Sequence, residues 1–148
     1  VIETEKETAQ WTYKKEKGYQ PMLGFMFEVG MVLCDEFRDG NVPAGAGAVG
    51  FLDECQRMMP EGKRIACYRA DSASYQAGVM NRCLRDGVLF TITADQDSAV
   101  REAVKNIGTE EWQPYERGRQ IAETVHTMNG TKEAFRPRCI GALAQGAG

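Results

Sequence analysis

Three glycines in the stretch PAGAGAVGFL have the spacing G-x-G-x-x-G, which some proteins use to bind a dinucleotide. In that use the first glycine ends a strand and the pyrophosphate meets the N-terminus of the next helix. An acid about 20 residues further on binds the ribose. Here the glycines are Gly45, Gly47 and Gly50, and Asp71 follows at a compatible distance. The pattern raises the hypothesis of a nucleotide site.

The residues before these glycines argue against such a site. The β-like run MVLCDEF is separated from Gly45 by the loop RDGNVPA, which holds a Gly-Asn turn pair and a proline. The loop carries the glycines away from the strand end and places Gly47 and Gly50 in the first turn of a helix. We therefore expect the glycines to shape a loop and to contact no phosphate. A non-enzymatic nucleotide-binding α/β module that uses the Gly45–Gly50 loop is the alternative hypothesis.

Asp71 stands where the apolar run RIACYRA gives way to a helical pattern. Open α/β sheets place their chemistry at such strand ends. Asp71 and the serines after it are also good N-caps for the helix, and on the pattern alone the cap is favoured. Asp95, at the end of the run VLFTITAD, allows the same two interpretations with a stronger preference for the cap.

Length, charge and residue usage restrict the class of protein. The 148 residues suffice for one domain with a sizeable core, and no apolar run approaches the roughly 18 residues of a membrane span. The net charge of −3 means that any nucleic-acid contact has to be a local patch. Five scattered cysteines without a C-x-x-C pair indicate reduced core thiols in a cytoplasmic protein. The single histidine, His126, is typical of an ordinary strand residue, whereas a metal held by carboxylates fits the composition.

The elements that would position these residues follow from the periodicity. Two β-like runs meet at Gly30 and predict an antiparallel hairpin. Helical stripes over residues 46–62, 72–87 and 96–108 alternate with strands over 64–70 and 88–95. That order demands parallel pairing through right-handed crossovers, so the hairpin and the later strands predict a mixed sheet. We expect Val1 and Ile2 to begin or continue a strand beside the RIACYRA strand.

Beyond Gly108 the pattern changes to two β-like runs around the turn MNGT. We therefore expect a core over residues 1–108, a β-rich segment over 109–140 and an unstructured tail over 141–148. The chain starts without methionine, in what resembles the tail of a strand, and ends in a run of small residues. We interpret it as a piece of a longer protein.

Several segments together resemble the DDE transposases of bacterial insertion sequences. They are YKKEKGYQPML, GNVPAGAGAVGFL, RADSASY with GVLFTITAD, and AETVHTMNGTKEAFR, covering the chain from about Ile2 to Arg136. The resemblance implies an α/β fold with a ribonuclease-H-like mixed sheet flanked by helices. It also implies that residues 109–140 are the start of a β-rich insertion near the C-terminus. The aspartate of the step R-A-D-S, here Asp71, would be the second acid of the Asp-Asp-Glu triad.

The implied activity is metal-dependent DNA strand cleavage and transfer. This is an in-line displacement supported by two Mg²⁺ (or Mn²⁺) ions, for which Asp71 would be a catalytic residue and a metal ligand. The first acid of the triad is expected upstream of Val1 and the glutamate downstream of the insertion. We therefore expect the 148 residues alone to be an inactive fragment of the catalytic core.

The implied partner is double-stranded DNA at the transposon ends, with a homodimer as a further expectation and no membrane. The residues expected to contact DNA phosphates are Lys14, Lys15, Lys17 and Arg69, with the aromatic Trp11, Tyr13 and Tyr19 interleaved. A solvated loop, in which Glu16 offsets the lysines, is an equally open interpretation.

Overall fold

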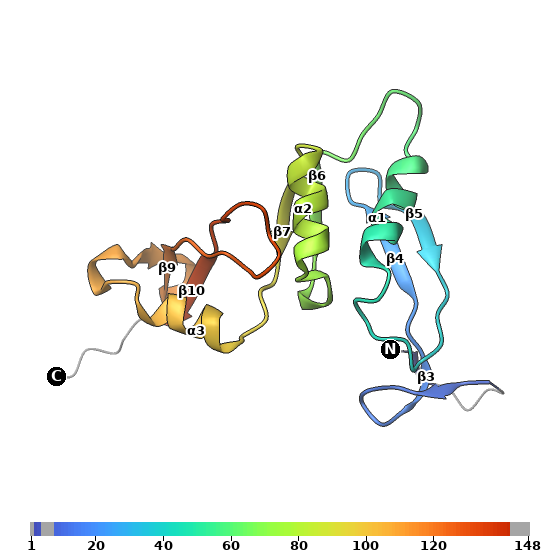
Figure 1. Cartoon of the computed structure of the whole chain (residues 1–148), viewed down its shortest axis with the longest axis horizontal. Helices are drawn as coiled ribbons and strands as arrows, with labels where there is room; N and C mark the ends of the chain where they lie inside the picture. The colour runs from blue at the N-terminus through green and yellow to red at the C-terminus, as the bar shows by residue number, and fades with distance from the viewer. Residues whose placement is uncertain (1, 4–7, 143–148) are drawn as a thin grey trace. The chain divides into compact units, whose positions relative to one another are not determined.

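The computed structural model of the chain describes residues 2–3 and 8–142. The chain divides into two compact units, Val1–Ile92 and Thr93–Gly148, and each is described by itself (Figure 1). None of the helices among the described residues has the length and apolar character that crossing a membrane requires.

The first unit contains seven strands, two α-helices and one 3-10 turn among its described residues. They are β1 (Ile2–Glu3), β2 (Gln10–Trp11), β3 (Lys17–Tyr19), β4 (Met22–Met26), β5 (Met31–Glu36), α1 (Ala48–Arg57), β6 (Cys67–Ala70), η1 (Ser72–Ser74), α2 (Ala77–Arg85) and β7 (Leu89–Ile92). The predicted hairpin is confirmed, because β4 and β5 pair antiparallel on either side of a turn in which Gly30 has a φ of 67°. The predicted parallel pairing is also confirmed, with β6 against β7 from Cys67↔Leu89 to Ala70↔Ile92.

The strands of this unit form three small sheets instead of one continuous mixed sheet. The orders are β1-β3-β2, β4-β5 and β6-β7. The predicted position of Ile2 beside the RIACYRA strand is wrong, because β1 pairs with β3 through Ile2↔Tyr19 and Glu3↔Gly18. Val1 lies outside the described residues. No strand among the described residues joins the β4-β5 hairpin to the β6-β7 pair, so the fold is mixed α/β with separate sheets.

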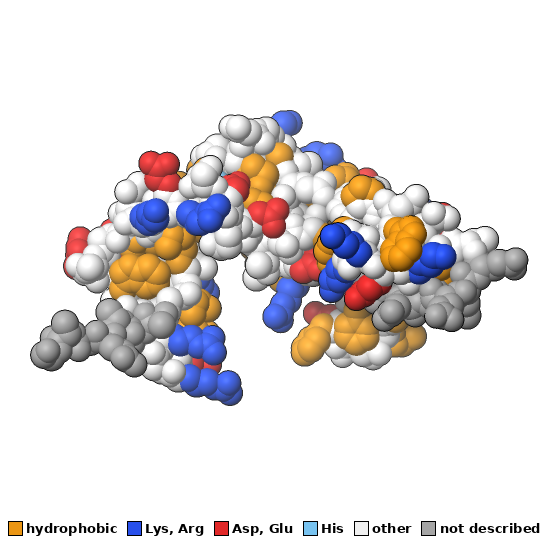
Figure 2. Space-filling view, turned by 90° about the horizontal axis from the view of Figure 1, so that it is seen from below, with side chains coloured by type: hydrophobic (Ala, Val, Ile, Leu, Met, Phe, Trp, Pro, Cys, Tyr) orange, Lys and Arg blue, Asp and Glu red, His pale blue; other side chains and the backbone are white. Residues whose placement is uncertain are grey.

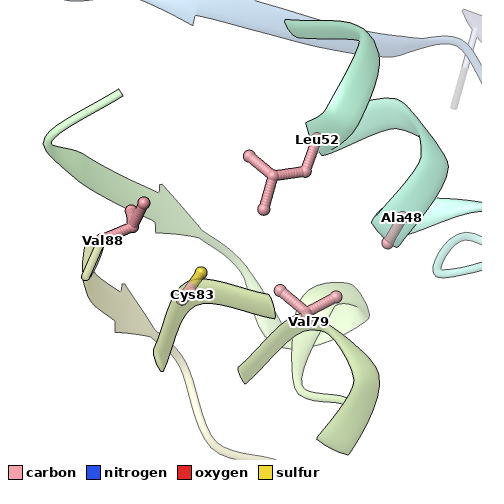
Figure 3. Packing of buried hydrophobic residues seen from close by; sticks show 5 residues of the cluster. All are labelled: Ala48, Leu52, Val79, Cys83 and Val88. Carbon is pink, nitrogen blue, oxygen red and sulfur yellow. The ribbon is translucent and has the colours of Figure 1, made fainter. Parts of the chain in front are cut away.

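The core of the first unit lies between its two helices (Figure 3). Ala48 and Leu52 from α1 meet Val79 and Cys83 from α2, together with Val88 just before β7, and each is at most 8% exposed. Each helical pair is four residues apart, which puts both side chains on one face. Burying a leucine or valine side chain of this cluster stabilises the fold by roughly 1.5–3 kcal/mol. The packing of α1 against α2 therefore fixes the positions at which the loops before these two helices join them.

The cysteines are all free, and their burial differs. Cys55 and Cys83 are buried, as predicted for core thiols, whereas Cys67 is exposed and two others are half-buried. Burial, the largest cause, raises the pKa of Cys55 to about 11. This thiol is therefore protonated and unreactive at neutral pH.

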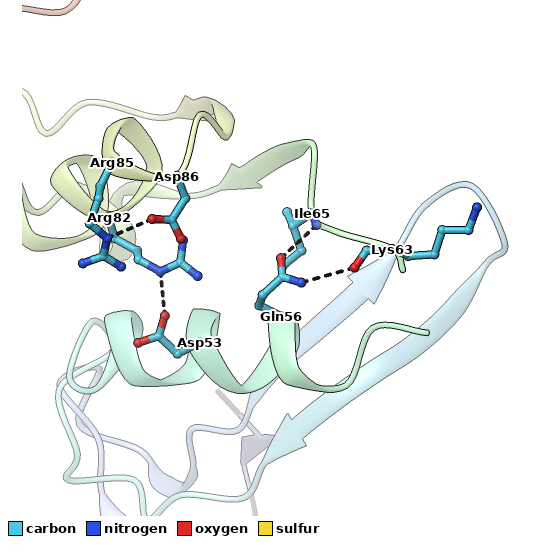
Figure 4. Close-up of polar contacts among 7 residues, drawn as sticks. All are labelled: Asp53, Gln56, Lys63, Ile65, Arg82, Arg85 and Asp86. Atoms are coloured by element: carbon cyan, nitrogen blue, oxygen red, sulfur yellow. Dashed lines mark hydrogen bonds and ion pairs between the residues drawn. The ribbon is translucent and has the colours of Figure 1, made fainter. Parts of the chain in front are cut away.

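A buried arginine connects the same two helices (Figure 4). The Arg82 side chain of α2 is 7% exposed, and its Nε donates to Asp53 of α1 at 2.6 Å. Its guanidinium also pairs with Asp86, one turn further along. A buried guanidinium is costly without a carboxylate partner, and the two carboxylates offset that cost.

The second unit contains one α-helix, two 3-10 turns and three strands among its described residues. They are α3 (Ser98–Lys105), η2 (Thr109–Glu111), β8 (Gln113–Tyr115), η3 (Glu116–Gly118), β9 (Arg119–Glu123) and β10 (Arg138–Ala142). The strands form an antiparallel sheet in the order β10-β9-β8, and His126 forms a bridge with Phe135. The two β-like runs around MNGT are thus confirmed, whereas the domain boundary near Gly108 stays a prediction.

Candidate functional site

Asp71 is the first residue after β6 and has an extended backbone, with φ −80° and ψ −173°. Its Oδ1 accepts a hydrogen bond from the backbone N–H of Ala73 at 3.0 Å, so it caps the 3-10 turn η1. The hydroxyls of Tyr68 and Ser74 hydrogen-bond to each other at 3.0 Å across the same turn. Burial, the largest cause, raises the pKa of Tyr68, which keeps this phenol neutral. The Asp71 carboxylate itself is exposed.

The predicted helix caps are corrected in both places. Asp71 does not cap the helix, because η1 intervenes and α2 begins only at Ala77, with Gln76 at its N-cap position and no side-chain cap bond. At α3 the N-cap is Asp97, whose Oδ1 accepts from Val100 N at 2.8 Å, instead of Asp95. A capping side chain must reach the amides of the first helical turn, and the two helices start later than their apolar stripes indicated.

The glycine loop packs directly against the Asp71 turn. Gln76 Nε2 donates to the carbonyl of Gly45 at 2.8 Å and to that of Ala73 at 2.7 Å. A Cβ on Gly45 would lie 2.3 Å from the Ala73 carbonyl oxygen and 2.2 Å from Gln76 Nε2. Only glycine therefore fits at this point, because any side chain would collide with the turn that carries Asp71.

The other side of the loop is held by a buried arginine. Arg38, 8% exposed, donates from Nε to the carbonyl of Gln20 at 2.9 Å. Its two terminal nitrogens donate to the carbonyls of Ala46 at 2.8 Å and Ala44 at 3.1 Å, on either side of Gly45. Arg38 and Gln76 together satisfy loop carbonyls that would otherwise favour water over a packed position.

The two other glycines of the motif have different roles. Gly47 is the N-cap residue of α1 with a φ of 78°, a left-handed conformation that favours glycine, and Gly50 lies inside α1 with open space around it. β5 ends at Glu36, well before α1 begins at Ala48, so the glycines do not follow a strand directly. This arrangement agrees with the prediction that the motif shapes a loop.

Three of the four predicted DNA-contacting cations lie on one hairpin, formed by β2, the turn Thr12–Glu16 and β3. Figure 2 shows hydrophobic and basic side chains next to each other over this part of the first unit. Lys17 Nζ lies 5.8 Å from the centre of the Trp11 ring, and Lys14 Nζ lies 5.9 Å from that of Tyr13. Tyr19 does not share this surface, because it is only 9% exposed and packs on Phe37.

Arg69 is separate from these lysines. It is exposed on β6, which belongs to another sheet, and Figure 1 shows β6 and β3 at opposite ends of the first unit. Arg69 instead lies on β6 two residues before Asp71, which directly follows that strand. The three lysines therefore share one hairpin, whereas Arg69 lies on the strand that leads to Asp71.

The described residues do not form a complete metal site. No three histidine, cysteine, aspartate or glutamate side chains within 2–3 and 8–142 are grouped closely enough to hold an ion. Asp71 offers an exposed carboxylate oxygen, the ligand type that Mg²⁺ prefers and often takes from one or two side chains only. It can supply one ligand and needs others to complete a site.

Sequence reasoning missed Arg38 and Gln76. Arg38, two residues after the end of β5, gives no signal of burial in the sequence, because arginine is usually exposed. Gln76 gives a weak signal of a special role, since it occupies a helix N-cap position that serine, threonine, aspartate and asparagine usually take.

The chain was compared with known protein families, curated proteins and solved structures. A family model described as transposase DDE domain group 1 matches residues 2–136. No curated protein and no solved structure matches the chain. The matched range includes the Asp71 turn, the glycine loop and the lysine-bearing hairpin.

Proposed function

The chain belongs to the family of transposase DDE domains, and on this premise we propose that it forms part of a catalytic core that cleaves and transfers DNA strands in the full-length protein. The family suggests DNA as the partner and divalent metal ions as the cofactor. The observation that carries the proposal is the position of Asp71. It stands at the carboxyl end of a parallel strand, on a turn held by Gln76 and the glycine loop.

We propose Asp71 as the second acid of the triad and as a ligand of Mg²⁺ or Mn²⁺. The bound ions would supply the Lewis-acid chemistry of an in-line displacement at phosphorus. Asp71 would hold its carboxylate at a fixed point beside the scissile phosphate. A misplacement of about 1 Å can cost a hundredfold in rate, which is why such an acid needs a turn that cannot shift.

The remaining parts of the core are proposed in the same terms. The two other acids of the triad would come from residues beyond these 148, as the resemblance to DDE transposases implies. The chain alone would then be inactive. The ribonuclease-H-like core would span residues 1–108, with the β-rich insertion over 109–140. We place the reaction in the cytoplasm, as the cysteine pattern predicts.

Contact with the transposon-end duplex is proposed for the lysines of the β2–β3 hairpin and for Arg69. Lysines bind phosphates without reading sequence and make affinity depend on salt. In a chain with a net charge of −3, the stretch 10–19 is a local exception, because it carries Lys14, Lys15 and Lys17 and a single acid, Glu16. Arg69 would contact DNA at the strand that ends in Asp71.

The proposal is tested by Asp71→Asn in the full-length transposase. Asparagine caps a turn as well as aspartate does, so the fold stays intact while the charge that holds a divalent ion is lost. We expect strand cleavage to fall by at least about a hundredfold in an assay with labelled transposon-end DNA. Asp97→Asn is the matched control, because Asp97 makes an equivalent capping bond at α3. Undiminished cleavage by Asp71→Asn would leave Asp71 as a cap alone.

A further inference from the structure

The hairpin of β2 and β3 carries two aromatic rings that the fold leaves open. Trp11 is 62% exposed and Tyr13 is 71% exposed. Large aromatic rings usually contribute to a core, and here the neighbouring Thr12 is the buried residue, at 6% exposure. Most of the surface of both rings is therefore left outside the core.

The turn between β2 and β3, which carries Tyr13, is held in one shape. Thr12 N donates to Glu16 O at 2.8 Å, and Lys15 N donates back to Thr12 O at 3.0 Å. The hydroxyl of Thr12 accepts from Lys14 N at 3.2 Å, and Lys15 has a φ of 61°. A turn fixed in this way presents its side chains with little further loss of entropy on binding.

Each exposed ring has an ammonium group placed over it, in a cation–π contact. Lys17 is the cross-strand partner of Trp11, and its Nζ lies 5.8 Å from the ring centre. Lys14 follows Tyr13 directly, and its Nζ lies 5.9 Å from that ring. Sites for single-stranded nucleic acid combine aromatic rings that stack on bases with basic side chains that contact the backbone phosphates.

We infer that this hairpin binds unpaired DNA, with Trp11 and Tyr13 stacking on bases and Lys14 and Lys17 contacting the adjoining phosphates. The inference rests on the proposed DNA function and goes further, because it states that the bound DNA is unpaired at this hairpin. In a duplex the base faces are covered by their neighbours, so exposed rings can stack only where bases are frayed, displaced or single-stranded. Lysines alone would bind the phosphates of a duplex equally well, so the exposed rings are what favours unpaired DNA.

The two tryptophans of the chain, Trp11 and Trp112, make the test direct. In Trp112→Phe, Trp11 is the sole fluorescent tryptophan. We expect a thymidine oligonucleotide of about 15 nucleotides to quench it and to bind about tenfold tighter than a blunt duplex of that length. With Lys14 and Lys17 on phosphates of a single strand, log K should fall with log salt at a slope of about −1.4.

Variants separate stacking from charge. Trp11→Ala should weaken binding of the oligonucleotide about tenfold, and Trp11→Phe should restore most of it because the ring is kept. Phe27→Ala is the matched control, since Phe27 is 86% exposed on the β4–β5 turn and has no place in the inference. Circular dichroism of each variant checks that the fold is retained.

Three outcomes would overturn the inference. Equal or tighter binding of the duplex without quenching would show that the lysines contact only the backbone, and the proposed transposase function would survive. A Trp11 signal that changes with protein concentration and not with DNA would show that the rings cover a second protein copy. Binding of neither DNA form at low salt would remove the hairpin from DNA contact, while Asp71→Asn would still test catalysis separately.

Discussion

Asp71 and Asp97 make the same local bond in two different settings. Each accepts a backbone N–H through Oδ1, at 3.0 Å from Ala73 and 2.8 Å from Val100. Asp97 begins an eight-residue α-helix, and capping accounts for it fully. Asp71 caps a turn of three residues, yet that turn is also held by a loop from a distant part of the chain.

This difference identifies what capping does not explain. Capping a three-residue turn does not require the hydrogen bond from Gln76 to the Gly45 carbonyl. It also does not require a glycine at position 45, where the loop packs against the turn. Arg38, buried on the other side of the loop, adds three hydrogen bonds to carbonyls. Restraint from two sides suits a carboxylate whose position matters, and the following predictions test that contrast.

The largest effect is expected from Gly45→Val. The new side chain would enter the space of the Ala73 carbonyl, where even a Cβ lies only 2.3 Å from the oxygen. We expect a loss of about 2–3 kcal/mol in the free energy of unfolding, measured by urea denaturation. Gly50→Ala is the control, with open space around it, and should stabilise α1 by about 0.5–1 kcal/mol. Equal effects at both positions would show that the loop is not packed on the turn.

Gln76→Ala should have the next largest effect. The carbonyls of Gly45 and Ala73 would lose their shared donor, which costs about 1–2 kcal/mol for partly buried groups. Thermal unfolding measures the change, with the exposed Gln96→Ala as control. In the full-length transposase the same variant should lower the cleavage rate more than substrate affinity, because the turn shifts while DNA contacts stay. A variant as stable as the wild type would show that the hydrogen bonds of Gln76 do not restrain the Asp71 turn.

Removing the two caps should sharpen the comparison further. Asp97→Ala leaves the first turn of α3 without its acceptor and should cost about 1 kcal/mol. Asp71→Ala should cost less, since it caps only three residues and the turn keeps its contact with Gln76. Parallel urea titrations give both values. If Asp71→Ala were the more destabilising change, Asp71 would be primarily structural.

The smallest effect on stability is expected from Asp86, which follows α2 and pairs with Arg82 and Arg85, and this effect depends on pH. Hydrogen bonding from Arg85, the largest cause, and the nearby Arg82 lower the pKa of Asp86 below its ordinary 3.8. Because the folded pKa is depressed, this contribution is present above the unfolded pKa and is lost as the pH falls below about 4. Asp86→Asn should therefore flatten the stability profile in that range. An unchanged profile would show that the pairs of Asp86 with Arg85 and Arg82 add no net stability.

The sequence predicted the elements that depend on local pattern. The β4–β5 hairpin, the parallel β6–β7 pair and the three helices follow from periodicity and glycine positions, which are properties of neighbouring residues. The single mixed sheet was not obtained, because Ile2 pairs with Tyr19 instead of with β6. Strand partners are chosen by long-range contacts that no local pattern records.

The same division holds at the candidate site. By itself the sequence determined that Asp71 ends a strand, that lysines and aromatic residues alternate before Tyr19, and that the glycines stand too far from a strand for a dinucleotide. Only the tertiary structure decided that Gly45 lies against Ala73, that Tyr19 is buried and that Arg69 is apart from the lysines. The physical reason is that residue type fixes what a side chain can do, whereas packing between distant segments fixes which neighbours it meets.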